Sequence, residues 1–300
     1  MERFFDDISS ILSRDPGNRG LMPFLPKPDP SAAYHAFEGA SRALIVTGFP
    51  IRAQDGRVCC ETDGPPGAAD MAYALAACNV ATSVATDETS FPQVRAAVDC
   101  RAPGVRTYLV KKGDAAAARR LINDLAPTHV IPIERPGKGA DGRFHSSRGA
   151  VIDDWLADTD LVYSLARQAG AVAIAIGDGG NELGTGAHRA AVSRLLPGGD
   201  VIAAKQDADV TLMTGVSNWW GWGVAALLSA RVGRDLLPSA AQEIRLMRTL
   251  LEAGAADGIT KQPAMSVDGL SLEENLAVLE ELRGALKRYL AGRIRDERIG

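Results

Sequence analysis

Short runs of apolar residues recur along the chain and alternate with longer polar and mixed segments. The runs occupy residues 43–47, 80–86, 105–110, 129–133, 171–176 and 209–213. Several are apolar on both faces, which is typical of strands in a parallel sheet that helices cover on each side. Helical segments separate them. This alternation predicts an α/β fold with a doubly wound, mostly parallel, Rossmann-like sheet.

Two helices are indicated by the spacing of their apolar residues. The first spans 159–169, with Asp158 as its N-cap and Gly170 at the position after its end. The second lies between Ser271 and Arg295, where leucines recur every three or four residues. These leucines are Leu276, Leu279, Leu282, Leu286 and Leu290. The C-terminal part is therefore expected to form a helical cover.

The chain shows no internal repeat and no long linker, so one α/β domain over residues 1–300 is predicted. Residues 1–40 form an N-terminal preamble with one short helix. The proline-rich segment LMPFLPKPDPS follows that helix and is expected to be irregular. Residues 41–232 hold the sheet and its loops, and residues 233–300 form the helical part.

Composition narrows the class of protein. Hydrophobic residues make up 46% and charged residues 23% of the 300 residues, and the net charge is −4. An acidic chain without a basic run is not expected to bind nucleic acid. No apolar stretch approaches the roughly 20 residues of a membrane helix. The N-terminus MERFFDDISS resembles neither a signal nor a transit peptide, so a cytoplasmic location is expected.

Polar residues gather directly after the expected strands. A further polar segment lies between the first expected strand, 43–47, and the helix that follows it. The carboxyl ends of parallel strands form the ligand-binding edge of such a sheet, so these loops predict a site. They include Thr47 and Gly48, the segment ETDGPPG with Glu61 and Asp63, Arg135, the loop DGRFHSSRG with Arg148, the segment 177–182, and Ser217 with Asn218.

Each group also has a purely structural interpretation. Gly177–Glu182 can be a tight turn with solvated acids, Asp63 can cap the following helix, and Arg135 and Arg148 can form surface ion pairs. Dinucleotide binding is disfavoured because Glu182 stands where the G-x-G-x-x-G pattern needs glycine. The four scattered histidines lack the spacing of a zinc site.

A set of short motifs occurs in a fixed order. The motifs are IVTGFP, ETDGPPGA, ERPG followed by DG and SRG, IGDGGNELG and VSNWWGWG, with DGIT and SVDG as closing pieces. Together they resemble the D-glutamate cyclase family from about Arg42 to about Gly269. The resemblance implies a hydro-lyase that reversibly dehydrates D-glutamate to 5-oxo-D-proline, with an amino acid as its small-molecule substrate.

The roles of individual residues follow from the chemistry of such a cyclisation. Glu61, Asp63, Asp178 and Glu182 are the candidate catalytic acids and bases, and clustered carboxylates can divide these roles because they separate one another's pKa values. The glycines beside them are expected to bring backbone amides to a substrate carboxylate. The candidate substrate-binding residues are Thr47, Gly48, Arg135, Arg148, Gly179, Gly180, Asn181, Ser217 and Asn218.

Metal binding and other functions remain open at this point. Asp63, Asp178 and Glu182 offer oxygen ligands suited to Mg²⁺ or Mn²⁺, and no nucleotide cofactor is expected. The alternative is a metal-dependent phosphoryl or nucleotide enzyme, with Lys205, Arg135 and Arg148 serving the phosphates. A non-catalytic amino-acid-binding protein is a third possibility. The substrate enantiomer, the need for a metal and the formation of a homo-oligomer are not decided by the sequence.

Overall fold

The computed structural model describes residues 1–17 and 20–299, with side chains described as far as Arg293. Within this part of the chain, six parallel strands form one sheet in the order β5-β4-β1-β6-β7-β8. The strands are β1 (Arg42–Thr47), β4 (Ala81–Asp87), β5 (Arg106–Val110), β6 (His129–Ile133), β7 (Val172–Gly177) and β8 (Val210–Met213). All six expected strands are present within a residue or so of their predicted bounds, and the predicted α/β class is confirmed.

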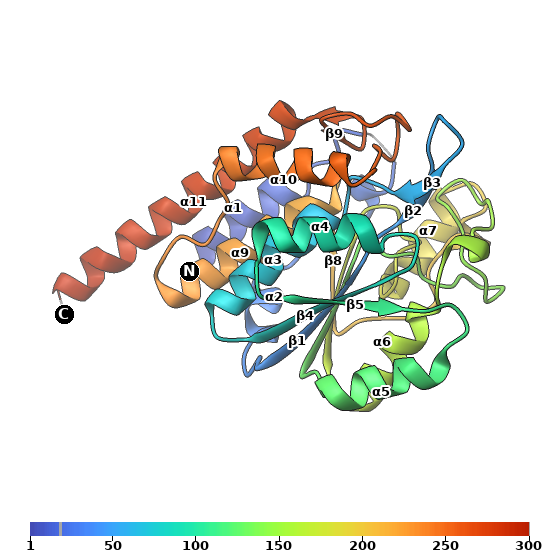
Figure 1. Cartoon of the computed structure of the whole chain (residues 1–300). Helices are drawn as coiled ribbons and strands as arrows, with labels where there is room; N and C mark the ends of the chain where they lie inside the picture. The colour runs from blue at the N-terminus through green and yellow to red at the C-terminus, as the bar shows by residue number, and fades with distance from the viewer. Residues whose placement is uncertain (18–19, 300) are drawn as a thin grey trace.

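Helices cover both faces of the sheet (Figure 1). Side chains alternate between the two faces: Ile45 of β1 packs with one helical layer, and Leu44 and Val46 pack with the other. The first layer contains α1 (Glu2–Leu12), α2 (Pro30–Ala36), α3 (Pro65–Ala77), α4 (Phe91–Arg101), α9 (Ser217–Val232), α10 (Ala240–Glu252) and α11 (Leu272–Ile299). The second contains α5 (Ala115–Leu125) and α6 (Thr159–Gln168).

The predicted helix boundaries agree with local capping. Asp158 accepts a hydrogen bond from the Leu161 amide at the start of α6, and Gly170 follows its end with φ +91°. Leu279, Leu282 and Leu286 of α11 are fully buried. In Figure 1, α11 runs along the helical layer and extends beyond it at the C-terminus. None of the helices described is both long and apolar enough to serve as a membrane span.

The proline-rich segment is more regular than expected, which corrects the prediction for residues 21–31. Met22–Phe24 form a 3₁₀ helix, and Pro30 opens α2. Asp29 caps α2 by accepting a hydrogen bond from the Ala32 amide. Proline is tolerated in the first turn of a helix, where its missing N–H would have had no partner within the helix.

Two hairpins are too short for apolar periodicity to reveal. They pair β2 (Pro50–Arg52) with β3 (Val58–Cys60) and β9 (Ser266–Val267) with β10 (Leu270–Ser271). Short helical elements complete the order: α7 (Arg189–Leu195), α8 (Gly199–Ile202) and the 3₁₀ turns Asp153–Trp155 and Gly186–His188. Both hairpins lie beside the carboxyl ends of the strands and contribute residues to the cavity described below.

The helices α3 and α9 cross where each carries a glycine. A Cβ added at Gly221 would lie 2.4 Å from the Cα of Gly67. The helices also cap each other. Asp63 accepts hydrogen bonds from the Ser217 and Asn218 amides, while Asn218 Oδ1 accepts from the Gly64 and Gly67 amides. This exchange fixes the start of both helices at the edge of the sheet.

Candidate active site

A cavity of about 460 Å³ opens beyond the carboxyl ends of β1, β6 and β7. Segments far apart in the sequence line it: β2, the loops after β3, β6 and β7, residues 146–155 and residues 258–268. Of the site residues predicted from sequence, the described lining includes Glu61, Arg148, Asp178, Gly179, Asn181 and Glu182. The sequence-based prediction of a site at this edge therefore corresponds to a real cavity.

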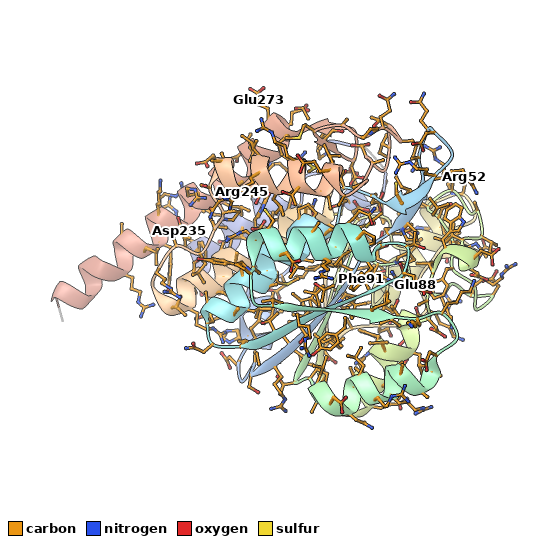
Figure 2. All side chains as sticks on the ribbon, in the orientation of Figure 1. Arg52, Glu88, Phe91, Asp235, Arg245 and Glu273 are labelled. Carbon is orange, nitrogen blue, oxygen red and sulfur yellow. The ribbon has the colours of Figure 1, made fainter. Side chains whose placement is uncertain are left out.

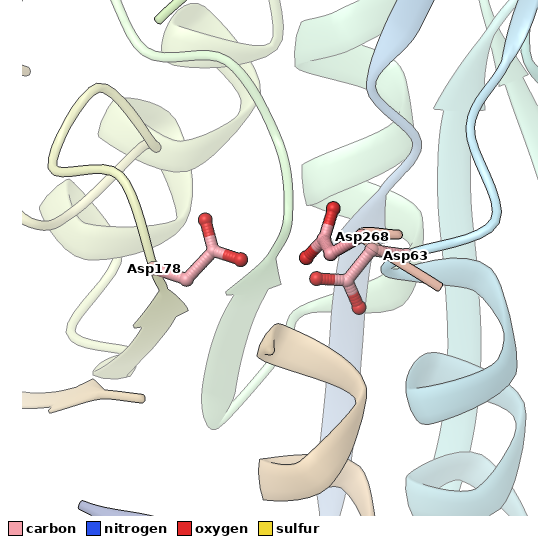
Figure 3. A group of neighbouring side chains, drawn as sticks. All are labelled: Asp63, Asp178 and Asp268. Carbon is pink, nitrogen blue, oxygen red and sulfur yellow. The ribbon is translucent and has the colours of Figure 1, made fainter. Parts of the chain in front are cut away.

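Asp178 lies at the centre of a group of carboxylates. A carboxylate oxygen of Asp178 lies within 4.8 Å of oxygens of Asp63 and Asp268, and one lies within the same limit of oxygens of Glu134 and Glu182. Asp178 comes directly after β7, and Figure 3 shows its carboxyl group turned toward Asp63 and Asp268. The Asp178 side chain is 3% exposed. This arrangement concentrates acidic side chains in one part of the cavity.

Asp63 and Glu182 both use their carboxylate oxygens to hold backbone amides. Asp63 accepts from the first amides of α9, as described above. Glu182 accepts from the Gly179 amide at 2.8 Å and the Gly180 amide at 2.7 Å. Backbone donors stabilise a carboxylate in its ionised form. Through these hydrogen bonds the two residues shape the loops around Asp178.

The glycines at 177 and 179 have a different role from the one expected. A Cβ at Gly177 would lie 2.5 Å from Glu182 Oε2, and one at Gly179 would lie 2.9 Å from Glu182 Oε1. The bare backbone thus makes room for the Glu182 carboxylate. The sequence predicted that these amides would face a substrate carboxylate, and in this structure the Gly179 and Gly180 amides donate to Glu182.

Glu134 lines the cavity and was not among the predicted candidates. It follows β6 immediately, is 5% exposed and has φ +39°, a left-handed conformation that glutamate rarely adopts. Ser217 Oγ donates a 2.6 Å hydrogen bond to Glu134 Oε2. Burial, followed by the neighbouring charges of Asp178 and Glu182, raises the pKa of Glu134 well above its ordinary value. Its position directly after a central strand was the sequence signal that could have identified it.

Arg135 lies inside the fold rather than in the cavity. Its guanidinium donates to Asp87 at 2.6 Å, to the carbonyls of Gly48 and Ala157, and to Thr159 Oγ1. The side chain is fully buried. These bonds connect the loops after β1, β4 and β6, so the structure gives Arg135 a structural position and leaves it no contact with a ligand in the cavity.

Most of the other predicted binding residues lie outside the described lining and support the cavity, while Asn181 belongs to the lining. Thr47 lies close to Glu134, because a Cβ added at Gly64 would meet both Thr47 Oγ1 and the Glu134 side chain. The Gly48 carbonyl accepts a hydrogen bond from Arg135. Gly180 packs against Val192, Ser217 bonds Glu134, and Asn218 caps α3. Asn181 lines the cavity and donates to the His145 carbonyl, which joins the loop after β7 to the 141–152 loop.

The loop after α10 carries Asp268 and Lys261 to the cavity. Asp257 organises this loop by accepting hydrogen bonds from the Ile259, Thr260 and Gly269 amides and from Ser266 Oγ. Asp268 and Lys261 have positive φ values, +54° and +61°. Neither was predicted as a site residue, although Asp268 lies in the SVDG motif. A residue without a place in a strand or helix gives little local signal.

Cationic side chains at the cavity are fewer than acids. The described lining holds five acidic residues, which are Glu61, Glu134, Asp178, Glu182 and Asp268. It holds three cationic residues, which are Arg52, Arg148 and Lys261. Arg52 comes from β2 and lies at the edge of the molecule in Figure 2. Lys205 and Arg135 do not belong to the described lining, so the phosphate-binding set considered from sequence is not brought together here.

The carboxylates are suited to a hard cation. Within the described ranges, Asp63, Asp178 and Asp268 form one group with converging oxygens, and Glu134, Asp178 and Glu182 form another. Oxygen ligands of this kind match Mg²⁺ or Mn²⁺. The predicted ligands Asp63, Asp178 and Glu182 are thus divided between two overlapping groups that share Asp178.

Comparison with known proteins places these features in a family. Residues 8–283 match the family described as D-glutamate cyclase-like, C-terminal. A human protein named "D-glutamate cyclase, mitochondrial" is 31% identical over 300 residues, an alignment that covers 88% of this chain and 48% of the human protein. The chain therefore spans about half the length of that curated relative. Every residue described as lining the cavity falls inside the matched region, and the chain belongs to the D-glutamate cyclase-like, C-terminal family.

Proposed function

We propose that this protein is a lyase that reversibly converts D-glutamate to 5-oxo-D-proline and water. Family membership supports the reaction class, and the human relative carries the name of this activity. The observation that carries the proposal is the buried pair of Glu134 and Asp178 in one cavity, with burial raising the pKa of Glu134. A cyclisation of this kind needs both a proton donor and a proton acceptor.

The reaction balances without any other reactant. The α-nitrogen of D-glutamate forms a bond to the γ-carbon, and one γ-oxygen leaves. The α-ammonium loses two protons in becoming a lactam nitrogen, and both depart with that oxygen as water. Because nucleophile and electrophile belong to one molecule, holding the curled conformer lowers the entropic part of the barrier.

We assign the proton donor to Glu134 and the proton acceptor to Asp178. A carboxyl group that burial keeps protonated can give its proton to the departing γ-oxygen. Asp178 lies next to Glu134 and at the centre of the carboxylate group, from which it can receive a proton from the α-ammonium. Asp63 and Glu182 are occupied with backbone amides and position these two residues.

The cations of the lining are suited to the α-carboxylate, which does not react. Arg148 is exposed on the 141–152 loop, while Arg52 and Lys261 come from separate segments. A guanidinium can hold a carboxylate through two parallel hydrogen bonds. Binding at this side of the cavity leaves the amine and the γ-carboxyl group to the acidic side.

The proposal is tested by following turnover with NMR in both directions. Purified protein is incubated with D-glutamate, L-glutamate and each enantiomer of 5-oxoproline, before and after exhaustive chelation and with Mg²⁺ or Mn²⁺ restored. Interconversion of D-glutamate and 5-oxo-D-proline is the expected result. Absence of turnover under every metal condition would contradict the proposal. Activity that follows metal addition would show that a bound cation neutralises the γ-carboxylate of the substrate.

A further inference from the structure

Part of the cavity lining is apolar and offers few suitable contacts for a substrate as polar as glutamate. Trp155, Leu196 and Ile259 line this apolar side while keeping part of their surface exposed, and Ile259 is 48% exposed. Phe49, Ile51 and Ile152 complete this side and belong to one hydrophobic cluster with Trp155. Glutamate offers such a surface only two methylene groups between its polar ends.

The size of the cavity also exceeds the need of a free amino acid. Its volume of about 460 Å³ falls within the range of roughly 300–1,000 Å³ typical of pockets for drug-sized ligands. Such pockets combine mostly apolar walls with a few well-placed polar groups. Here carboxylates gather around Asp178, three cationic residues also line the cavity, and much of the remaining lining is apolar. The ligand that fits this division has a glutamyl end and an apolar extension.

Charge favours the extension at the γ-carbon. Free D-glutamate carries a γ-carboxylate into a cavity whose described lining contains more acids than cations. An amide at this carbon has no charge, and its carbonyl is a better electrophile than a carboxylate. The same acid–base pair can therefore act on it without first neutralising the substrate.

We propose that the protein also cyclises γ-D-glutamyl amides with an apolar amine substituent, releasing that amine. This inference rests on the proposed function, because it uses the same site and the same attack. The α-nitrogen bonds to the γ-carbon, and the bond from that carbon to the amide nitrogen breaks. Of the two protons lost by the α-ammonium, one goes to the departing nitrogen and the other to solvent. The products are 5-oxo-D-proline and the free amine.

The test uses a series of γ-D-glutamyl n-alkylamides with methyl, propyl and hexyl groups, beside D-glutamate and the L-enantiomers. NMR measures 5-oxoproline formation against enzyme-free blanks. Burial of one methylene is worth up to about a fourfold gain in binding. We expect kcat/KM to rise with alkyl length, by at least about tenfold from methyl to hexyl, since most of the five added methylenes enter the apolar side.

Variants of the apolar lining test whether it causes the rise in kcat/KM with alkyl length. Trp155→Ala and, as a second and more exposed position, Ile259→Ala should each lower the hexyl-to-methyl ratio of kcat/KM by about threefold or more. Leu109→Ala is the matched control, because Leu109 is 38% exposed on β5 and does not line the cavity. It should leave the ratio unchanged. Thermal unfolding of each variant checks the fold.

The outcomes separate this inference from the proposed function. Turnover of D-glutamate without turnover of any amide, or without dependence on alkyl length, overturns the inference alone. Turnover of the amides without turnover of D-glutamate supports the inference and overturns the proposed dehydration. If neither substrate class reacts, both are overturned. A ratio that responds equally to Trp155→Ala, Ile259→Ala and Leu109→Ala also overturns the role assigned to the apolar wall.

Discussion

Neighbouring acids in one cavity differ in their pKa and in their role, as Glu134 and its neighbours show. Glu134 is enclosed by the fold and lies near several other acids, so its pKa is raised, first by burial and then by the charges of Asp178 and Glu182. Glu182 and Asp63, by contrast, accept hydrogen bonds from backbone amides. A carboxyl group's role here depends on its partners rather than on its residue type.

Replacing Glu134 by Gln is expected to lower kcat by at least about a hundredfold, the low end of the contribution of a general acid. Glutamine keeps the shape but has no acidic proton. Because the pKa of Glu134 is raised, the wild-type rate should be retained well above the pH at which an ordinary glutamic acid ionises, and should fall only when Glu134 loses its proton. Steady-state kinetics across pH provide the measurement, and near-normal kcat in a folded variant would remove Glu134 from the mechanism.

Asp178→Asn is expected to lower kcat to a similar extent by removing the proton acceptor. Binding of 5-oxo-D-proline, measured by calorimetry, should persist because the amide is similar in size. Asp207→Asn is a suitable control, since Asp207 accepts hydrogen bonds from Tyr163 and Arg167 only through its backbone carbonyl and lies outside the described cavity lining. Equal activity of both variants would contradict the assignment.

At the scale of elements, α3 and α9 position the site by capping each other. Asp63 precedes α3 yet holds the first amides of α9, and Asn218 at the start of α9 holds amides of α3. Ser217, which bonds Glu134, belongs to the same first turn. The orientation of the acid is thereby coupled to the crossing of two helices.

Asn218→Ala is expected to lower the free energy of unfolding by about 1–2 kcal/mol, because the buried Gly67 amide loses its acceptor and the Gly64 amide keeps only Asp63. It should also reduce kcat by disturbing Ser217 and Glu134. Ser239→Ala removes the exposed capping box of α10 and is the matched control. That variant should lose stability without loss of kcat. Chemical denaturation and kinetics measure both effects, and a fully active Asn218→Ala would show that the two helices do not position the acid.

At the scale of the whole molecule, a second group of buried charges joins the helical layer away from the cavity. Asp70 of α3 accepts hydrogen bonds from Arg101 of α4 and Trp222 of α9, and Glu243 of α10 lies beside it. Burial, followed by the charge of Asp70, raises the pKa of Glu243 well above its ordinary value, although Arg101 opposes this. The packing of four helices is therefore linked to protonation.

The stability contributed by protonated Glu243 is fully present below its unfolded pKa of about 4.3 and is lost as pH rises toward the higher folded value. Between about pH 5 and pH 8, the wild-type free energy of unfolding should fall more than that of Glu243→Gln. Glu252→Gln on the exposed side of α10 is the control and should follow the wild type. Parallel pH profiles for wild type and Glu243→Gln would contradict this linkage.

Local sequence pattern predicted the sheet and the edge at which the site lies. The central strands β1, β6 and β7 are short apolar runs, and burial on both faces requires such a run whatever its neighbours are. The convergence of Glu61, Asp178, Glu182 and Arg148 on one cavity followed from parallel topology, since carboxyl ends of parallel strands share an edge. The short hairpins and the 257–269 loop lacked this periodic signal.

Only the tertiary structure decided what each charged residue faces. Arg135 and Glu134 are adjacent in the chain. Arg135 donates hydrogen bonds to buried partners from other loops, whereas Glu134 lines the cavity. Asp63 is held by amides 154 and 155 positions away. A carboxylate's charge state and role depend on the donors and charges within a few ångströms. Those groups come from segments far apart in the chain, and their positions in space cannot be read from the sequence.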